Sequence, residues 1–491
     1  MSQLFVCCEL GPAKGRVLLG SVSPEEMTVS EIHQFSTLPV QEKNSTQWDI
    51  TASYRALLDA IHTLGAYEEP LAGISCTSSV GDCLLFDSEG SLMLPAYHHS
   101  DPRSETGAER ALAAIPWETL YSQTGMQQRR DNALFLLATE SAKRLRHTSH
   151  ILPMADAFNF LLSGVPRVEM SLASTTQFFN PATRTWSEDV VRAAALSAKM
   201  LPPLVPAGTD LGPACEEIRR EPLFADTRIV ASCSDELAAT LAGLPLMGGE
   251  SWAFLRPGAW SLMGIQTPEP VINDAMRELG FNNQVGYGGS VFLYKSSTGL
   301  WILDECRRFW DQQDRVLDND LLLHLAGSAK PFESLIDPSD PRFAEPGDMP
   351  LKIQAYCRET DQTVPWKPGP IYRCVLESLA LHYRRMLLEL ERLTGAEVAR
   401  IYVHEAESHS LLNHFIANAL ELPVLIVPRE APAIGNLVVQ ALALGHLKSP
   451  DVARDVVSRS FKVESISPRS SLWGAAAERI ETIEDALSAE A

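Results

Sequence analysis

The chain has 491 residues, of which 45% are hydrophobic and 21% charged, and its formal net charge is −21. One ordinary hydrophobic core does not extend over this length, so two or three globular domains are expected. The negative charge argues against nucleic acid or an anionic membrane surface as a partner, because both are polyanions.

The first half of the chain alternates strand and helix patterns, as judged from the spacing of its apolar residues. The expected elements are strands at 3–8, 16–22 and 71–79, a hairpin at 82–94, helices at 53–66, 131–141 and 154–164, and a strand, turn and helix at 226–243. Ser232 and Ser234 are the candidate cap residues of the last helix.

The second half repeats this layout after a boundary near residues 245–250. Residues 250–264 predict a hairpin much like the one at 3–22, with Trp260, Leu262 and Met263 in the core. The further expected elements are helices at 298–310, 371–394 and 433–445, a strand, turn and helix at 398–420, a strand at 423–428, and a peripheral helical tail after 465. Two similar α/β halves predict a ligand site in a cleft between them, at loops beyond the strand ends.

The opening loop CCELGPAKGR (7–16) has two interpretations. A strand followed by a Gly-containing loop and a basic residue is one way to hold a phosphate, and Lys14 and Arg16 supply positive charge. Pro12, however, lacks a backbone N–H that could face a phosphate. Short Gly-containing turns between strands are common, so the residues alone favour a plain turn.

Several longer segments together resemble the rhamnulokinase branch of the FGGY sugar kinases. They are QFFNPATRTW (177–186), PGAWSLMG (257–264), STGLWILDECRRFW (297–310), DPRFAEPGDMPLKIQAYCRETDQTVP (340–365), CVLESLALHYRR (374–385) and EAPAIGNLVVQALALGHL (430–447). The resemblance implies an actin-like ATPase fold of two ribonuclease-H-like α/β domains. It also implies ATP-dependent phosphorylation of the 1-hydroxyl of a ketose such as L-rhamnulose. The implied boundaries are a sugar-side domain at 1–247, a nucleotide-side domain at 248–465 and a helical tail at 466–491.

Asp235 stands where the family carries its catalytic Asp, just before a helix. The resemblance therefore implies that Asp235 is the general base that accepts the proton of the substrate hydroxyl. From the residues alone, an Asp in this position is more often a helix cap.

The resemblance also assigns the phosphate and magnesium positions. In the first loop these are Glu9, Gly11, Lys14 and Arg16; Glu9 replaces the family's Asp and is one methylene longer, which would shift the geometry around Mg²⁺. The second phosphate loop departs as well, because Ala259 follows Gly258 where the family has a Thr hydroxyl.

The nucleotide and sugar positions differ from the family more strongly. Side chains replace three family glycines, and Asp304 replaces a Gln near ATP; the nucleotide-side residues are Asp304, His404, Glu405 and Ala406. The implied sugar-side residues are Gly81, Asp82, Ser234 and Ser296. His98 and His99 could line a sugar pocket or lie on a surface loop. The polar stretch 404–414 has residue types that suit zinc, but no metal site is expected there because the spacing fits a solvated turn better.

Two functions remain open from the sequence. One is an active sugar kinase that uses ATP and Mg²⁺ with remodelled sites. The other is a catalytically impaired pseudokinase that binds a sugar or a partner protein, since the phosphate and adenosine loops depart from the family together. A third, weaker hypothesis is that a different phosphoryl donor or a non-nucleotide anion occupies the cleft and binds Lys14 and Arg16. The nine scattered cysteines and the missing signal pattern lead us to expect a cytoplasmic chain with no membrane segment.

Overall fold

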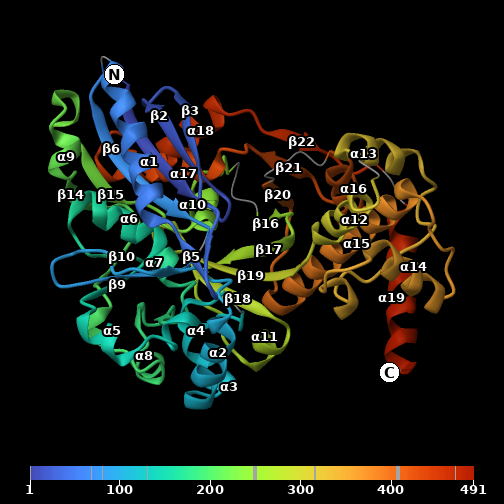
Figure 1. Ribbon diagram of the computed structural model, residues 1–491. Coiled ribbons are helices and arrows are strands. Elements are labelled where there is room, and N and C mark those ends of the chain that lie inside the picture. The colour runs from blue at the N-terminus through green and yellow to red at the C-terminus, as the bar shows by residue number, and fades with distance from the viewer. Residues whose placement is uncertain are drawn as a thin grey trace. The chain divides into compact units, whose positions relative to one another are not determined.

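The computed structural model describes residues 2–67, 69–79, 81–129, 131–246, 251–314, 317–404, 410–469 and 472–490, the last seven of these by their backbone alone. Its chain divides into two compact units that are each discontinuous in sequence (Figure 1). Unit 1 comprises Met1–Leu246, Thr267–Leu293 and Glu430–Lys462, and unit 2 comprises Met247–Gln266, Tyr294–Arg429 and Val463–Ala491. A late stretch of the chain therefore returns to complete the first unit.

Unit 1 is built on a six-stranded mixed sheet. Its strands, in spatial order, are β14 (Thr209–Pro213), β15 (Arg228–Ala231), β6 (Leu71–Ser78), β1 (Gln3–Leu10), β2 (Lys14–Val22) and β3 (Met27–Ser36). The three central strands β15, β6 and β1 are parallel, while β2, β3 and β14 pair antiparallel with their neighbours. The predicted hairpin at 3–22 is thus confirmed.

Smaller elements complete unit 1. Its short strands are β4 (Val40–Glu42), β5 (Ser45–Trp48), β7 (Cys83–Phe86), β8 (Ala96–Tyr97), β9 (His150–Pro153), β10 (Val168–Glu169), β11 (Phe179–Asn180), β12 (Thr185–Trp186), β13 (Leu204–Val205) and β18 (Phe281–Val285). Its α-helices are α1 (Ile50–Thr63), α2 (Arg103–Ala114), α3 (Trp117–Thr124), α4 (Ala133–Leu137), α5 (Ala142–His147), α6 (Met154–Ser163), α7 (Met170–Ala173), α8 (Glu188–Ala193), α9 (Glu216–Arg219), α10 (Glu236–Ala242), α11 (Asp274–Glu278), α17 (Ala431–Ala443) and α18 (Pro450–Ser460). Short 3₁₀ turns lie at Leu64–Ala66, Ala198–Met200, Pro222–Phe224 and Tyr287–Gly289. The helix predicted at 131–141 is much shorter than expected.

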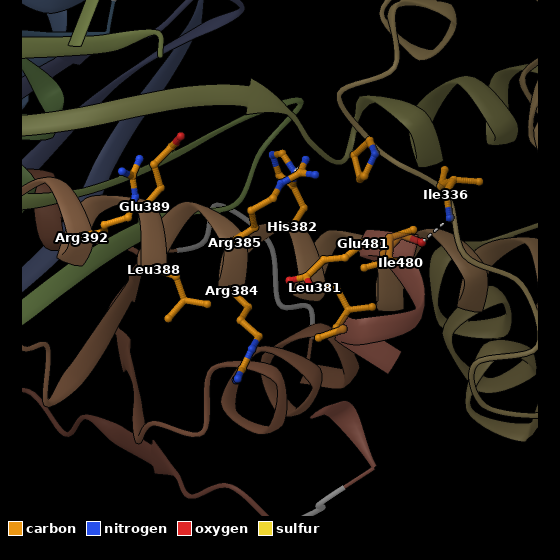
Figure 2. Close-up of a pocket in the computed structure, with 13 residues that line it drawn as sticks. Ile336, Leu381, His382, Arg384, Arg385, Leu388, Glu389, Arg392, Ile480 and Glu481 are labelled. Atoms are coloured by element: carbon orange, nitrogen blue, oxygen red, sulfur yellow. Dashed lines mark hydrogen bonds between the residues drawn. The ribbon is translucent and has the colours of Figure 1, made fainter. Parts of the chain in front are cut away.

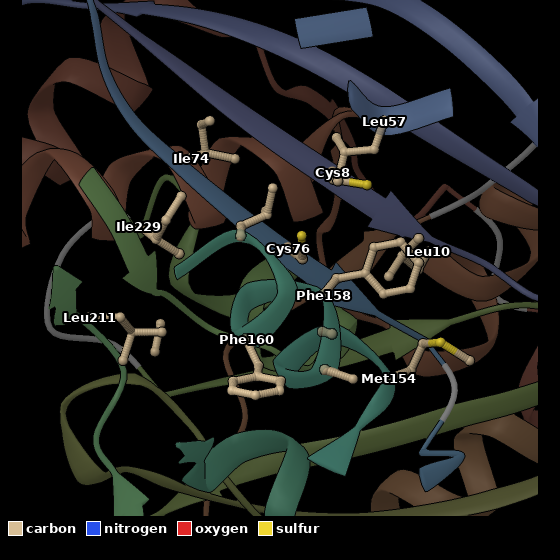
Figure 3. Close-up of a cluster of buried hydrophobic side chains, with 14 of the residues drawn as sticks. Cys8, Leu10, Leu57, Ile74, Cys76, Met154, Phe158, Phe160, Leu211 and Ile229 are labelled. Atoms are coloured by element: carbon tan, nitrogen blue, oxygen red, sulfur yellow. The ribbon is translucent and has the colours of Figure 1, made fainter. Parts of the chain in front are cut away.

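Helices cover both faces of the unit 1 sheet, because successive residues of β1 point to opposite sides. Val6 and Cys8 face a cluster with Leu57 of α1 and Phe158 of α6 (Figure 3). Phe5 and Cys7 face the other way, into a cluster with Ile434 and Leu437 of α17 and residues of α18. Burial on both faces explains why β1 has no polar residue before Glu9 apart from its first.

Unit 2 repeats this arrangement of a hairpin beside parallel strands. Of the seven strands in its sheet, the six that lie wholly or partly in unit 2 run in the order β19 (Val291–Thr298), β17 (Trp260–Thr267), β16 (Trp252–Arg256), β20 (Arg400–His404), β21 (Val424–Val427) and β22 (Glu464–Ile466). β16 pairs antiparallel with β17 and parallel with β20, as β1 does with β2 and β6. The helices are α12 (Trp301–Asp311), α13 (Asn319–Ser328), α14 (Met349–Glu359), α15 (Pro368–Thr394), α16 (Ser410–Leu420) and α19 (Trp473–Glu490), with a 3₁₀ turn at Pro341–Phe343.

The C-terminal helix α19, expected to be peripheral, begins against the body of unit 2. Its first residue, Trp473, is buried and packs edge-on against the Phe332 ring and at a tilt against the Phe415 ring. Ala476 and Ile480, one and two turns further on, are buried as well. Across the described part of the chain, no helix combines the length and the apolar character needed to span a membrane.

Candidate active site

Three neighbouring strands of unit 1 bring the opening loop and Asp235 to the same edge of the sheet. Leu10 at the end of β1 pairs in register with Ser78 at the end of β6, and Ser78 forms a parallel bridge with Asp235 beyond β15. The Ser78 backbone N–H donates to Ser234 O at 2.8 Å, and the Ser78 hydroxyl donates to Leu10 O at 3.2 Å. Adjacent strands lie about 4.8 Å apart, so two steps separate Leu10 from Asp235 by roughly 10 Å. The carboxyl ends of parallel strands are where α/β sheets place their ligands.

Asp235 is the N-cap of helix α10, as the residues alone favoured, and the alternative caps Ser232 and Ser234 are not. Its Oδ1 accepts from the Ala238 backbone N–H at 3.0 Å and also from Gln284 Nε2. The predicted caps are wrong because both hydroxyls are engaged elsewhere in the core: Ser232 Oγ donates to Asn436 O, and Ser234 Oγ donates to a buried carboxylate. Capping and a catalytic role do not exclude each other, since the cap fixes where the carboxylate points.

A buried pair of acids supports this turn. Asp156 Oδ1 accepts from Ser234 Oγ at 2.7 Å, and Glu169 Oε2 accepts from the Ser234 backbone N–H at 3.0 Å. The Ser171 hydroxyl donates to Glu169 and accepts from the Asp235 backbone N–H at 3.1 Å. Burial raises the pKa of Glu169 to about 7, and burial followed by repulsion from Glu169 raises the pKa of Asp156. The backbone at 234–235 is therefore fixed from inside the core.

Helix α17 packs closely against the helix that Asp235 caps. A Cβ on Gly435 would lie 1.8 Å from Ala239 O of α10, so only glycine permits this approach. The next residue, Asn436, accepts the Ser232 hydroxyl on its backbone oxygen at 2.8 Å and donates to Ser75 Oγ at 3.3 Å. The AIGN segment thus supports the Asp235 turn through packing in unit 1.

The opening loop forms the tip of the β1–β2 hairpin. The Gly11 backbone N–H donates to Lys14 O at 3.1 Å, and the Thr37 hydroxyl donates to Gly11 O at 2.7 Å. A Cβ on Gly11 would lie 2.9 Å from Lys14 O, which explains a glycine here. Pro12, Ala13 and Lys14 are exposed. The loop is a turn in its hydrogen bonding, and it also presents a lysine at the sheet edge shared with Asp235.

Glu9 and Arg16 face each other across the base of this hairpin. They are in register, and the Arg16 guanidinium donates through Nε at 2.8 Å and through Nη2 to Glu9 Oε2. Arg16 also lies 3.6 Å from Glu31. Burial raises the pKa of Glu9 to about 7 despite the opposing effect of Arg16. Glu9 Oε1 is buried and has no hydrogen-bond partner among the described residues, so a cation or water could occupy that position.

The β16–β17 hairpin of unit 2 is held at its tip by backbone groups. Gly258 O accepts from the Leu300 N–H at 2.7 Å, and Ala259 O accepts from the Gly299 N–H at 2.9 Å, just before α12 begins. Gly299 allows this contact, because a Cβ there would lie 2.4 Å from Gly258 O. Trp260, predicted in the core, is 52% exposed. The prediction was wrong because residue 260 begins β17, beside the exposed hairpin tip.

Other predicted residues of unit 2 lie near the same hairpin or on its neighbours. His404 ends β20, whose residue Val403 pairs with Leu255 of β16, so His404 lies at the sheet edge that carries the 257–259 tip. Asp304 lies on α12 and is ion-paired with Arg307. Ser296 is half-buried on β19. Glu405 and Ala406, together with the rest of 405–409, lie outside the described residues.

Asp82 and His98 form a buried polar cluster in unit 1. Asp82 Oδ2 accepts from Trp48 Nε1 at 2.7 Å and pairs with His99 Nδ1 at 2.9 Å. His98 packs on the Trp48 ring with 4.3 Å between ring centroids. Asp82 Oδ1 and His98 Nε2 are both buried without hydrogen-bond partners among the described residues. The neighbouring predicted Gly81 has Thr175 Oγ1 3.1 Å from where a Cβ would be.

The same cluster contains donors that could surround a metal ion. One ligand atom from each of Asp82, His98 and His99 can be chosen so that all three lie within 4.8 Å of one another. However, His98 Nδ1 accepts from the Ser100 backbone N–H at 3.0 Å, so the neutral ring carries its hydrogen on Nε2. Burial and then His99 lower the pKa of His98 to about 4, which keeps this ring neutral. An N–H donor beside a carboxylate oxygen suits a hydroxyl group better than a cation.

Sequence reasoning did not single out Asp156, Glu169 or Gln284 as site residues. Asp156 was the one signal available, because it is the only charged residue in the predicted helix at 154–164. Glu169 and Gln284 reach the turn from segments 65 and 49 residues away from their partners in it. Their proximity depends on the tertiary fold.

Comparison with known proteins identifies the class. Residues 15–242 match the N-terminal domain, and residues 253–444 the C-terminal domain, of the FGGY family of carbohydrate kinases. The chain therefore belongs to the FGGY family of carbohydrate kinases, as its resemblance predicted. It is 32% identical over 481 residues to a rhamnulokinase from Bacteroides thetaiotaomicron, covering 97% of this chain and 98% of that one. A rhamnulokinase from Enterococcus faecalis is also 32% identical, over 94% of this chain and 93% of its own.

Solved structures confirm the predicted fold class. The xylulose kinase from Lactobacillus acidophilus has a TM-score of 0.81 at 14% identity, with 99% of each chain covered. A Plasmodium falciparum glycerol kinase solved with ADP has a TM-score of 0.77 at 14% identity, covering 100% of this chain and 98% of its own. At such identities the similarity shows the fold alone, a two-domain α/β kinase fold of the actin-like ATPase type.

Proposed function

We propose that this chain catalyses ATP-dependent phosphorylation of a ketose such as L-rhamnulose, with Asp235 as the general base. The observation that carries the proposal is the alignment of Leu10, Ser78 and Asp235 at one edge of the unit 1 sheet. This edge combines a carboxylate with a loop that bears Lys14. Phosphoryl transfer depends on such positioning of a base and of phosphate-binding groups. Similarity to rhamnulokinases supports the choice of sugar.

Asp235 is suited to accept the proton of a sugar hydroxyl because its geometry is fixed beforehand. The Ala238 N–H and Gln284 Nε2 hold its Oδ1, while the buried acids Asp156 and Glu169 hold the backbone beside it. A general base whose position needs no reorganisation lowers the barrier to proton transfer. Ser234 then acts through its buried hydroxyl and amide as a positioning residue of the turn.

Glu9 fits the role of an Mg²⁺ ligand, because its buried Oε1 has no hydrogen-bond partner among the described residues. Mg²⁺ accompanying ATP would neutralise charge on the transferred phosphoryl group. A cation at Oε1 would favour the ionised carboxylate over the protonated form. Lys14, and Arg16 if it leaves Glu9, would bind phosphate oxygens. In unit 2, Gly258, Ala259, Asp304 and His404 are the candidate nucleotide contacts.

Asp82 and His98 are the sugar-side candidates with the clearest chemistry. Asp82 Oδ1 can accept a hydrogen bond and His98 Nε2–H can donate one, which are the two roles that sugar hydroxyls would satisfy. A site built in this way strongly rejects a ligand that lacks the hydroxyl, because both buried groups would stay unpaired. Gly81 and Ser296 complete the sugar-side proposal.

Calorimetric titration with Mg²⁺·ATP, followed by an ADP-release assay with L-rhamnulose, tests the proposal. We expect binding of Mg²⁺·ATP and ADP release that requires the sugar. Asp235→Asn keeps a good capping residue, so it should fold normally and lose about 10²–10⁴-fold in kcat. The matched control is Asp189→Asn, on an exposed aspartate in the first turn of α8, which should retain full turnover.

The opposite results would support the second function left open by the sequence. Absence of Mg²⁺·ATP binding at millimolar concentration would exclude the kinase. Nucleotide binding without turnover on any ketose would leave a sugar- or partner-binding protein on a kinase fold. Full turnover by Asp235→Asn would remove this residue from the mechanism.

A further inference from the structure

A cavity of about 260 Å³ lies within unit 2, between helices α15 and α19 and the segment at 336–338 (Figure 2). It is smaller than the roughly 300–1,000 Å³ of most ligand pockets, so its occupant would be small. No residue assigned above to sugar, phosphate or nucleotide binding lines it. A ligand bound in this cavity would therefore be separate from the sugar and the nucleotide.

One part of the cavity wall is apolar. Leu381 and Ile480, from α15 and α19, are buried, whereas Leu388 is 50% exposed at the cavity. An apolar group covering Leu388 would remove its surface from water, which favours binding. The ligand should therefore carry an apolar body.

The polar part of the wall carries a hydrogen-bond donor that lacks an acceptor. His382 Nδ1 accepts from Arg385 Nη2 at 2.9 Å, and because arginine only donates, the neutral ring carries its hydrogen on Nε2. His382 is 6% exposed, and its Nε2 has no hydrogen-bond partner among the described residues. Burial, then the nearby Arg385, lowers the pKa of His382 to about 3, so the ring is neutral at physiological pH. A buried N–H without an acceptor is costly, and a ligand oxygen would satisfy it.

The charges around this donor favour an anionic ligand. Arg384, Arg385 and Arg392 line the cavity, and Figure 2 shows His382 and Arg385 with their polar ends close together. Two acids also line it: Glu389 is paired with Lys295 at 2.9 Å, and Glu481 is exposed to solvent on α19. Asp337 Oδ1 forms an ion pair with Arg385 Nη2 at 3.1 Å, which partly neutralises that arginine. A carboxylate can accept from the His382 Nε2–H, and the positive charge of Arg385, which is bonded to the other ring nitrogen, favours its negative charge without direct contact.

We propose that this cavity is a binding site for a small monocarboxylate with an apolar body, distinct from the sugar and the nucleotide of the proposed reaction. The carboxylate accepts from His382 Nε2–H in the positive field of the cavity's arginines, and the apolar body covers Leu381, Leu388 and Ile480. The site lies wholly within unit 2, and it is independent of phosphoryl transfer.

Binding of 4-phenylbutanoate to the full-length chain, measured by calorimetry or ligand-observed NMR, tests this proposal. The neutral analogue 4-phenylbutan-1-ol has the same apolar body and should bind at least about tenfold more weakly, since hydrogen bonds to charged groups contribute more than neutral ones. His382→Ala should weaken binding of the carboxylate by about tenfold. The matched control, His324→Ala, changes an exposed histidine of α13 outside the cavity and should bind as the wild type does.

A second variant separates the site from an effect on folding. Ala477→Phe introduces a ring at the wall of the cavity and should abolish binding, with the thermal midpoint of each variant measured alongside. Equal affinity for acid and alcohol would overturn the proposal, as would undiminished binding by both His382→Ala and Ala477→Phe. No detectable binding of 4-phenylbutanoate by the wild type at about 10 mM would overturn it as well.

Discussion

Two corners of unit 1 lie at the same sheet edge and use buried carboxylates in different ways. The turn at Ser234–Asp235 is held by Asp156 and Glu169, which accept from amides and hydroxyls fixed by the fold. The hairpin at Leu10–Lys14 has an exposed tip, and its one buried acid, Glu9, accepts from the Arg16 side chain. Fixed neutral donors hold one geometry. A charged side chain can exchange its partner when a more strongly charged ligand arrives.

The largest effect is expected at the turn. Glu169→Gln places an amide N–H among three donors, namely the Ser171 amide, the Ser171 hydroxyl and the Ser234 amide. At least one buried donor then loses its acceptor, so the free energy of unfolding should fall by about 3 kcal/mol. Urea unfolding measures this loss. Glu216→Gln, at a side chain 80% exposed, is the control and should change nothing. An unaltered stability of Glu169→Gln would show that the network does not hold the turn.

The next effect is expected at Glu9 and depends on pH. Its folded-state pKa of about 7 exceeds the 4.5 of a free glutamate, so between these values the folded chain binds more protons than the unfolded chain. The contribution of the Glu9 carboxyl to the free energy of unfolding is therefore fully present below pH 4.5 and is lost as the pH rises through 7. Relative to Glu9→Gln, the wild type should lose about 2 kcal/mol of unfolding free energy between pH 5 and pH 8.

Denaturant titrations at several pH values check this slope. Glu31→Gln, which changes the more exposed partner of Arg16, should keep the wild-type slope. If the unfolding free energies of Glu9→Gln and the wild type change in parallel with pH, Glu9 has an ordinary pKa. The proposed difference between the two corners is then wrong.

A smaller effect is expected from Gly11→Ala at the hairpin tip. The added Cβ would lie 2.9 Å from Lys14 O, a backbone atom that must shift. The tip is exposed and can yield, so the free energy of unfolding should fall by about 1 kcal/mol. Thermal unfolding measures it, and Gly474→Ala, where a Cβ meets nothing within 4 Å, is the control. A loss as large as that of Glu169→Gln would make the tip as rigid as the turn.

The smallest effect on stability is expected from Pro12→Ala. Pro12 is exposed, so the free energy of unfolding should stay within about 0.5 kcal/mol of the wild type. The substitution restores a backbone N–H at the tip. If this tip contacts phosphate as proposed, Mg²⁺·ATP should bind Pro12→Ala more tightly than the wild type in calorimetry, whereas a tip that makes no such contact would leave the affinity unchanged.

Local patterns in the sequence predicted the elements, and long-range packing decided the details of the site. Both hairpins and the strand–turn–helix at Asp235 followed from apolar spacing and turn residues, and the family resemblance gave the fold. The network around Asp235 could not be predicted, because Glu169, Gln284 and Asn436 reach the turn from separate segments. The exposure of Trp260 had the same cause, since apolar character alone does not show which residue of a hairpin begins the strand.

The return of residues 430–462 to unit 1 has a consequence for synthesis of the chain. Until α17 has left the ribosome, Phe5, Cys7 and Leu18 lack the helix whose Ile434 and Leu437 cover them. A nascent chain that ends before residue 430 would therefore carry an uncovered apolar face on the unit 1 sheet, of the kind that chaperones protect. The strand at Gln3–Leu10 completes its core only after residues 430–462 have been added.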